Sequence, residues 1–219
     1  MIRGTRMIAT SILFLFMCVT MLHGIALIQG RTLLEMVRDH NPQRGPLIVT
    51  VTPFLQARGV SDLLKETDLV VEGIVDRSMS RLTTDQTSIE TAVDLTVTRV
   101  LFHNVKSVPV PTDAIRRVFI INPGGQLDMD GKSAVVIASG FSPLAVASRF
   151  VLFLKKMPNA TEGTFLLVNG AYGVFEVVDG RVVSVVATSS TNIHAHDGST
   201  VEAFSEMLRR LQPGGDRQD

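Results

Sequence analysis

The segment His194-Ala195-His196-Asp197 is the best candidate for metal chemistry in this sequence. In an extended segment, His194 and His196 point to the same side, and the carboxylate of Asp197 would add an oxygen ligand. Imidazole and carboxylate groups are common ligands of zinc. The pattern therefore predicts a divalent-metal site at His194, His196 and Asp197, which a metal-dependent hydrolase would use. The alternative is a polar loop before the next helix, because the sequence identifies no further ligand.

Other motifs for chemistry are incomplete. Asp128-Met129-Asp130-Gly131 resembles the start of a calcium loop, but Lys132 and Ser139 stand where the fifth and twelfth positions need oxygen ligands. We interpret this segment as a surface turn. The sequence contains no G-x-S-x-G, S-x-x-K or H-E-x-x-H motif for nucleophilic or metal-assisted catalysis. We therefore expect a protein that is not an enzyme and that needs no cofactor.

Composition excludes further classes of function. The chain carries 21 basic and 21 acidic residues, whereas a nucleic-acid-binding protein needs a basic patch for the phosphate backbone. A single tyrosine and no tryptophan leave few platforms for stacking bases. The only cysteine, Cys18, lies near the start of the chain, so the body of the protein has no disulfide. Met17 precedes it, where a lipidated cysteine would follow a small residue.

The first thirty residues predict where the protein is delivered. From Met7 to Ile28 no residue is charged and 17 of 22 are apolar, and two arginines precede the run. A helix of this length spans about 33 Å, enough for a hydrocarbon core of about 30 Å. Two interpretations fit: a transmembrane anchor, or a signal peptide cleaved after Ala26. In both, the arginines stay in the cytoplasm and the domain lies outside it, membrane-anchored or secreted. The expected membrane contacts include Met7, Leu13, Phe14, Leu15, Phe16 and Ile28.

The elements behind this leader define the expected domains. Residues 31–46 are polar and contain two prolines, which predicts a juxtamembrane stalk with a short helix across Thr32–Arg38. Residues 47–211 form the predicted domain, and residues 212–219 a disordered tail. Within the domain, nine short runs of β-forming residues are the candidates for about eight strands. The candidate strands cover residues 47–52, 69–80, 89–103, 115–122, 132–139, 150–155, 164–169, 173–178 and 181–187.

Three local signals indicate how these strands are connected and ended. Val178-Asp179-Gly180-Arg181 is typical of a type I′ hairpin turn, in which both central residues need a positive φ. Gly73 predicts a bulge or bend in the second strand. Ser199-Thr200-Val201-Glu202 is a capping box, which predicts an amphipathic helix that ends near Leu211. Long strands with one polar face and a terminal helix predict a mainly β protein, with a closed or partly closed antiparallel barrel.

The order of short motifs resembles a known family. Residues 66–75, Glu-Thr-Asp-Leu-Val-Val-Glu-Gly-Ile-Val, resemble the first strand of small exported prokaryotic OB-like barrels, which are similar to the netrin module and to tissue inhibitors of metalloproteinases. The resemblance covers residues 60–187 and implies an OB-like barrel. Its further motifs follow in order at residues 97–101, Pro123-Gly124-Gly125, residues 150–154, residues 170–175 and Val178-Asp179-Gly180.

The departures from this family are informative. Ser148-Arg149 stands where the family often has Gly-Glu before the fifth strand. A metalloproteinase inhibitor of this type chelates the protease zinc through a mature N-terminal cysteine, and this chain has no cysteine outside its leader. The resemblance therefore implies a fold but carries no site residue to this sequence.

An OB-like barrel without a catalytic motif, held outside the cytoplasm, predicts a non-catalytic interaction module. OB-type barrels bind ligands on one sheet face and its loops. We expect contact through the loop Asn122–Ser148, which carries apolar residues that look exposed at Phe141, Leu144 and Val146. Another envelope protein or a peptide is the expected partner. The alternatives are that these residues only cover the barrel end, that the protein is a metal-dependent hydrolase, or that the barrel edge inhibits a protease.

Overall fold

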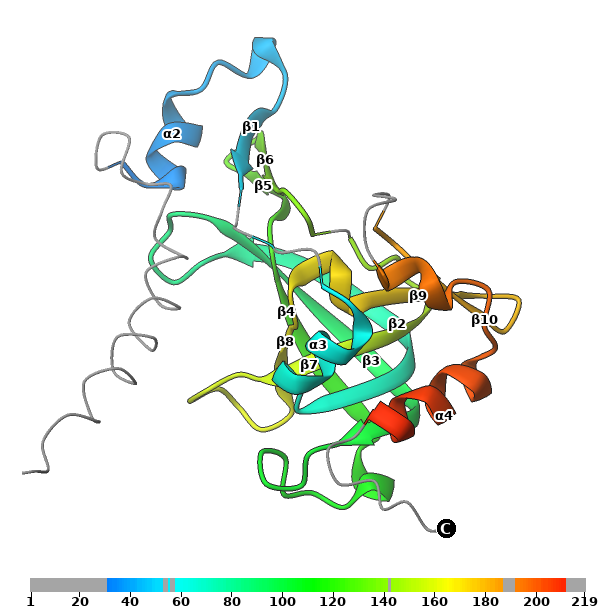
Figure 1. The fold of residues 1–219 in the computed structure, drawn as a ribbon. Helices are drawn as coiled ribbons and strands as arrows, with labels where there is room; N and C mark the ends of the chain where they lie inside the picture. Colours follow the sequence, from blue (N-terminus) through cyan, green and yellow to red (C-terminus); the bar gives the residue numbers. More distant parts are fainter. Residues whose placement is uncertain (1–30, 53–54, 56–57, 142, 187–191, 212–219) are drawn as a thin grey trace, which may run out of the picture.

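The computed structural model describes residues 31–52, 55, 58–141, 143–186 and 192–211 (Figure 1). The predicted leader, with Met7, Leu13, Phe14, Leu15, Phe16 and Ile28, lies outside the described residues, as does the predicted tail. Among the helices that are described, none is both long and apolar enough to cross a bilayer.

The main sheet is partly ring-like. Its strand order is β10-β9-β7-β2-β3-β4-β8, and a further pairing joins β8 to β7. The pairings therefore run in a circuit from β2 through β3, β4, β8 and β7 back to β2. The pairs are antiparallel except β4–β8, which is parallel and corrects the expectation of a purely antiparallel sheet. The strands are β2 (Leu69–Leu82), β3 (Ile89–His103), β4 (Arg117–Pro123), β7 (Arg149–Lys156), β8 (Thr164–Leu167), β9 (Val174–Val178) and β10 (Arg181–Ser184).

Alternating apolar side chains fill the inside of this circuit, which we call the barrel. Leu69, Val71 and Val75 of β2 pack there against Leu95 of β3. Gly73 leaves room for the side chain of Leu95, because an added Cβ would lie 2.5 Å from Leu95 Cδ2. A register shift between Glu72 and Gly73 confirms the predicted irregularity.

A second core covers one outer side of the barrel. The helices α3 (Val60–Glu66) and α4 (Val201–Leu211) and the 3₁₀ turn η5 (Asn192–His196) pack there against β7, β9 and β10. Phe153, Phe175 and Phe204 form its centre, with ring centroids 5.1–6.4 Å apart. The Thr200 hydroxyl accepts the hydrogen bond of the Ala203 N–H at 3.2 Å. Thr200 therefore caps α4, which corrects the expected capping box at Ser199.

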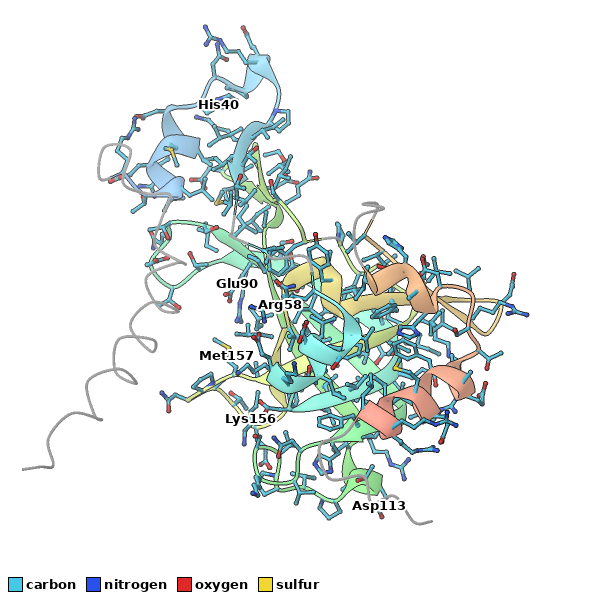
Figure 2. The ribbon with its side chains drawn as sticks, in the orientation of Figure 1. His40, Arg58, Glu90, Asp113, Lys156 and Met157 are labelled. Atoms are coloured by element: carbon cyan, nitrogen blue, oxygen red, sulfur yellow. The ribbon has the colours of Figure 1, made fainter. Side chains whose placement is uncertain are left out.

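A smaller unit, which we call the head, projects from one end of the barrel (Figure 1). It consists of α2 (Leu33–Asp39), β1 (Leu47–Val51), β5 (Gly125–Met129) and β6 (Lys132–Ala138), with the sheet order β1-β6-β5. The segment predicted to be a stalk thus contains a helix with buried Leu33 and Val37. Figure 2 shows His40 in the head and Asp113 at the far end of the barrel. The remaining 3₁₀ turns are η2 (Pro42–Arg44), η3 (Thr112–Ala114) and η4 (Gly170–Gly173).

The hairpin turns follow the local sequence closely. Asp179 and Gly180, with φ of 50° and 75°, connect β9 to β10, which confirms the predicted type I′ turn. Asp130 and Gly131, with φ of 51° and 75°, make the same turn between β5 and β6. The segment that resembled a calcium loop is therefore a surface turn, as expected.

Candidate functional site

The three residues of the predicted metal site do not converge. The segment 192–196 is a 3₁₀ turn and not an extended strand, so His194 and His196 are not presented to one side. His194 Nδ1 lies 2.8 Å from Asp197 Oδ2, whereas the His196 ring packs edge-on against Phe204. Asp197 Oδ1 accepts the Ser184 N–H at 2.7 Å. The histidine–aspartate pair fastens η5 to β10, and no three metal-binding side chains cluster anywhere in the described ranges.

The predicted contact loop, Asn122–Ser148, is largely folded into the strands β5 and β6. Val146 is 55% exposed, as expected. Leu144 is only 2% exposed and belongs to the core of the barrel, which corrects the expectation of a surface position. It is buried because the chain turns inward over the end of the barrel before β7 begins. Phe141 is half-buried.

Phe141 and Leu144 line a cleft of about 380 Å³ between the barrel and the head. One wall is the part of β2 and β3 that extends beyond the barrel, and the other is β6. The end of β4, the first residues of β5 and the segment after β6 complete the described lining. The lining residues are Ser78, Ser80, Thr91, Val93, Asn122, Pro123, Gly124, Gly125, Gln126, Val135, Val136, Ile137, Ala138, Phe141, Pro143 and Leu144.

Hydroxyl groups of Ser80 and Thr91 connect the walls of the cleft. Thr91 Oγ1 donates to the Gly124 carbonyl oxygen at 2.7 Å, and Ser80 Oγ lies 3.0 Å from Thr91 Oγ1. Because the Thr91 proton is used, Ser80 is the donor of the second bond. An added Cβ on Gly125 would lie 2.4 Å from both hydroxyls, so only glycine lets β5 cross here. The Pro-Gly-Gly sequence thus sets the position of the cleft.

Asn122 is the least satisfied polar group of the cleft. It lies on the inner face of β4 with Val118 and Ile120, and it is 5% exposed. Its Oδ1 has no hydrogen-bond donor among the described residues. A buried polar atom without a partner costs about 1–3 kcal/mol. Asn122 therefore brings a hydrogen-bond acceptor that the described residues leave unused to the lining of the cleft.

Among the described residues that line the cleft, none has a charged or titratable side chain. Its polar groups are hydroxyls, amides and main-chain atoms, and the remainder is apolar. General acid–base catalysis needs a group that exchanges a proton near neutral pH, such as histidine or a carboxylate. Serine is a nucleophile only with a nearby base. The described lining is consequently suited to holding an uncharged group and has no side chain for proton transfer.

A cluster of ion pairs around Glu72 involves no residue of this lining. The fully buried carboxylate of Glu72 contacts the guanidinium groups of Arg99, at 3.0 Å, and Arg149. Arg99 also contacts Glu202 of α4 at 3.0 Å. The main-chain N–H of Glu202 and then Arg99 lower the pKa of the Glu202 carboxyl. This cluster joins β3, β2 and β7 to α4. Its role is therefore structural.

Sequence reasoning named two residues of the cleft, Phe141 and Leu144, and missed its polar groups. Asn122 follows the apolar residues 118–121 of β4 and shares the face of Val118 and Ile120. An amide on the apolar face of a strand was the available signal for it. Ser78 and Thr91 carried no signal, because they looked like part of an ordinary polar strand face.

No protein-family model matches the chain, and no curated protein is significantly similar to it. The resemblance of residues 60–187 to small OB-like barrels therefore stays a prediction. The geometry of the cleft is the feature from which a function can be proposed.

Proposed function

We propose that this protein is a non-catalytic binding module with an OB-like barrel, and that its ligand enters the cleft between the barrel and the head. The strand circuit supports the architecture, because an OB fold is a five-stranded, partly open Greek-key barrel. In chain order, the first strand of the circuit pairs with the second and fourth, and the third runs parallel to the fifth. The netrin-like relationship is part of the same proposal.

The observation that carries the proposal is the unpaired side-chain oxygen of Asn122. Asn122 lines the cleft of about 380 Å³, and its buried Oδ1 has no donor among the described residues. Ligand sites are mostly apolar, with a few polar groups that fix the orientation of the ligand. Val93, Ile137 and Phe141 supply the apolar part here. The described lining residues include no titratable side chain, which favours binding over catalysis.

The location is the second part of the proposal. If residues 7–28 anchor the chain in a membrane, the head is the part nearest the bilayer, because α2 begins at Leu33. The cleft then lies between a membrane-proximal head and a barrel further out. Another envelope protein or a peptide is the proposed partner outside the cytoplasm.

A matched pair of variants tests whether the cleft binds ligands. Ser78 lines the cleft, whereas Met79 is 54% exposed and does not belong to the lining. Consecutive strand residues point to opposite faces, so Ser78→Trp fills the cleft and Met79→Trp leaves it empty. We would screen the full chain in lipid nanodiscs with neutral amides and alcohols, and follow the methyl NMR signals of Val93, Val135, Ile137 and Leu144.

We expect bound fragments to shift these methyl signals in the wild type and in Met79→Trp, but not in Ser78→Trp. Shifts that persist unchanged in Ser78→Trp would place binding elsewhere on the molecule. A screen in which no fragment shifts any of the four residues would overturn the proposed site.

A further inference from the structure

The second half of β2 has one unpaired side. β3 pairs with β2 as far as Leu82, but β7 pairs with it only from Leu69 to Ile74. One further pair of main-chain hydrogen bonds joins Val75 to Ala147 and Ser148. The described residues just before residue 147 no longer pair with β2. From Arg77 to Leu82, no described strand pairs with the other side of β2. This stretch offers a row of main-chain donors and acceptors to an added strand.

The charged side chains of this stretch do not cover its open edge. Arginine and lysine side chains often protect exposed edges of sheets. Here Arg77 and Arg81 turn back toward β3, where they contact Asp94 at 3.6 Å and Glu90 at 2.7 Å. Figure 2 places Glu90 where the barrel meets the head. Both arginines are thus held on the paired side of the strand.

The open edge borders the cleft. Ser78 and Ser80 belong to the part of β2 that has one open side. Both line the cleft, whereas Met79 between them does not. The side chains of an added strand alternate between two faces. Every second side chain of a peptide on this edge would therefore point toward the cleft. Main-chain pairing would supply affinity, and the cleft would supply specificity.

The lining defines which side chain enters. The described lining offers no charged residue, so a charged side chain that entered would be buried without an ionic partner there, which is strongly unfavourable. The walls are apolar, and Asn122 Oδ1 needs a donor. An uncharged side chain with an apolar body and an O–H or N–H group, such as threonine or tyrosine, satisfies both conditions.

We propose that the ligand is an extended peptide segment that adds to β2 along Arg77–Leu82 and places an uncharged, hydrogen-bond-donating side chain in the cleft against Asn122. This inference rests on the proposed function, because it assumes that the cleft is the binding site.

Peptides selected against the full chain in nanodiscs test the inference. A random heptapeptide phage library is depleted on the Ser78→Trp variant and then selected on the wild type. Binding peptides are synthesised with N-methyl groups on one alternate set of main-chain nitrogens or on the other. A peptide paired with one strand presents only alternate N–H groups to it. We expect one methylated set to abolish binding and the other to leave it nearly unchanged.

The Asn122→Leu variant tests the side-chain contact. It keeps the size of the side chain but removes the acceptor, and it relieves an unpaired buried group, so it is expected to fold. We expect binding of a threonine- or tyrosine-bearing peptide to weaken about tenfold. A peptide with valine at that position should not weaken, and the Met79→Ala variant should bind both peptides as the wild type does.

The outcomes separate the two proposals. Fragments that shift the cleft signals, together with peptides that are insensitive to the pattern of N-methylation, would overturn the added strand and leave the binding module standing. Recovery of no peptide in spite of fragment binding would do the same. A monomer–dimer equilibrium that Ser78→Trp abolishes would identify a second copy of this chain as the occupant and would also overturn the peptide.

Discussion

The barrel and the head differ in how the edges of their sheets are protected. In the barrel, each of the five strands of the circuit has at least two neighbours, and Leu95 and Leu152 inside it are fully buried. In the head, β1 and β5 are the two edges of a three-stranded sheet. Ile48 and Ile137 on that sheet are 59% and 47% exposed. Closure thus protects the barrel, whereas the head depends on what it packs against.

The head is built on an arm of the barrel. Leu82 and Ile89, at the tip of the β2–β3 hairpin, contribute to its core. The Leu33 N–H donates to the Gln86 carbonyl oxygen in the same hairpin at 2.9 Å. Loosening the head would therefore leave the circuit of the barrel intact, whereas loosening the barrel would remove the support of the head. The comparison teaches that the stability of the head depends on the barrel, whereas the stability of the barrel does not depend on the head.

The largest expected effect comes from the barrel. Leu152→Ala removes a fully buried side chain from the closed circuit. Closed packing limits relaxation around the cavity, so we expect a loss of about 4 kcal/mol in the free energy of unfolding. Urea denaturation followed by circular dichroism measures it. A loss below about 1 kcal/mol would show that the circuit is not tightly packed.

The matched change in the head is Leu33→Ala, which also removes a fully buried leucine. The small core of the head can collapse around the vacancy, so we expect about 2 kcal/mol, at the low end of the usual range. Hydrogen exchange should rise in α2, β1 and β6 and stay unchanged in β7 and β8. Equal exchange in all these elements would mean that head and barrel unfold as one unit.

The smallest effect concerns the contact of α4 with the barrel at low pH. The pKa of Glu202 is lowered from 4.5 in the folded protein, so its carboxylate stabilises the fold above pH 4.5. This stabilisation is lost as the pH falls through the lowered pKa. The wild type should be more stable than Glu202→Gln at pH 7, and the two should converge in acid. A difference in denaturation midpoint that is independent of pH would contradict this assignment.

Sequence patterns predicted those elements whose side chains alternate clearly. The strand expected at 89–103 is β3, and the helix expected to end near Leu211 is α4. β5 was missed because Gly125-Gln126-Leu127-Asp128-Met129 is short and half polar, and its pairing with β6 depends on the Asp130-Gly131 turn. Local patterns are reliable where the local sequence alone decides the structure.

The candidate site was predicted only in part, because tertiary packing makes it. Phe141 was a correct indication of the region, but Leu144 faces inward as the chain crosses the barrel end. The cleft depends on a close crossing at Gly125 and on a hairpin that extends past the barrel. The His194–Asp197 pair, in turn, looked like metal ligands because the sequence does not show that Ser184 already uses the carboxylate.

The strand circuit also constrains the order in which the protein folds. β8, at Thr164–Leu167, pairs with both β4 and β7 and so completes the circuit. The barrel cannot close before this late segment has left the ribosome or, in an exported chain, the translocation channel. Pairings between distant segments fold slowly, and unpaired edges aggregate in the meantime. We therefore expect a partner that shields the β2–β3 hairpin during synthesis to raise the yield of folded protein.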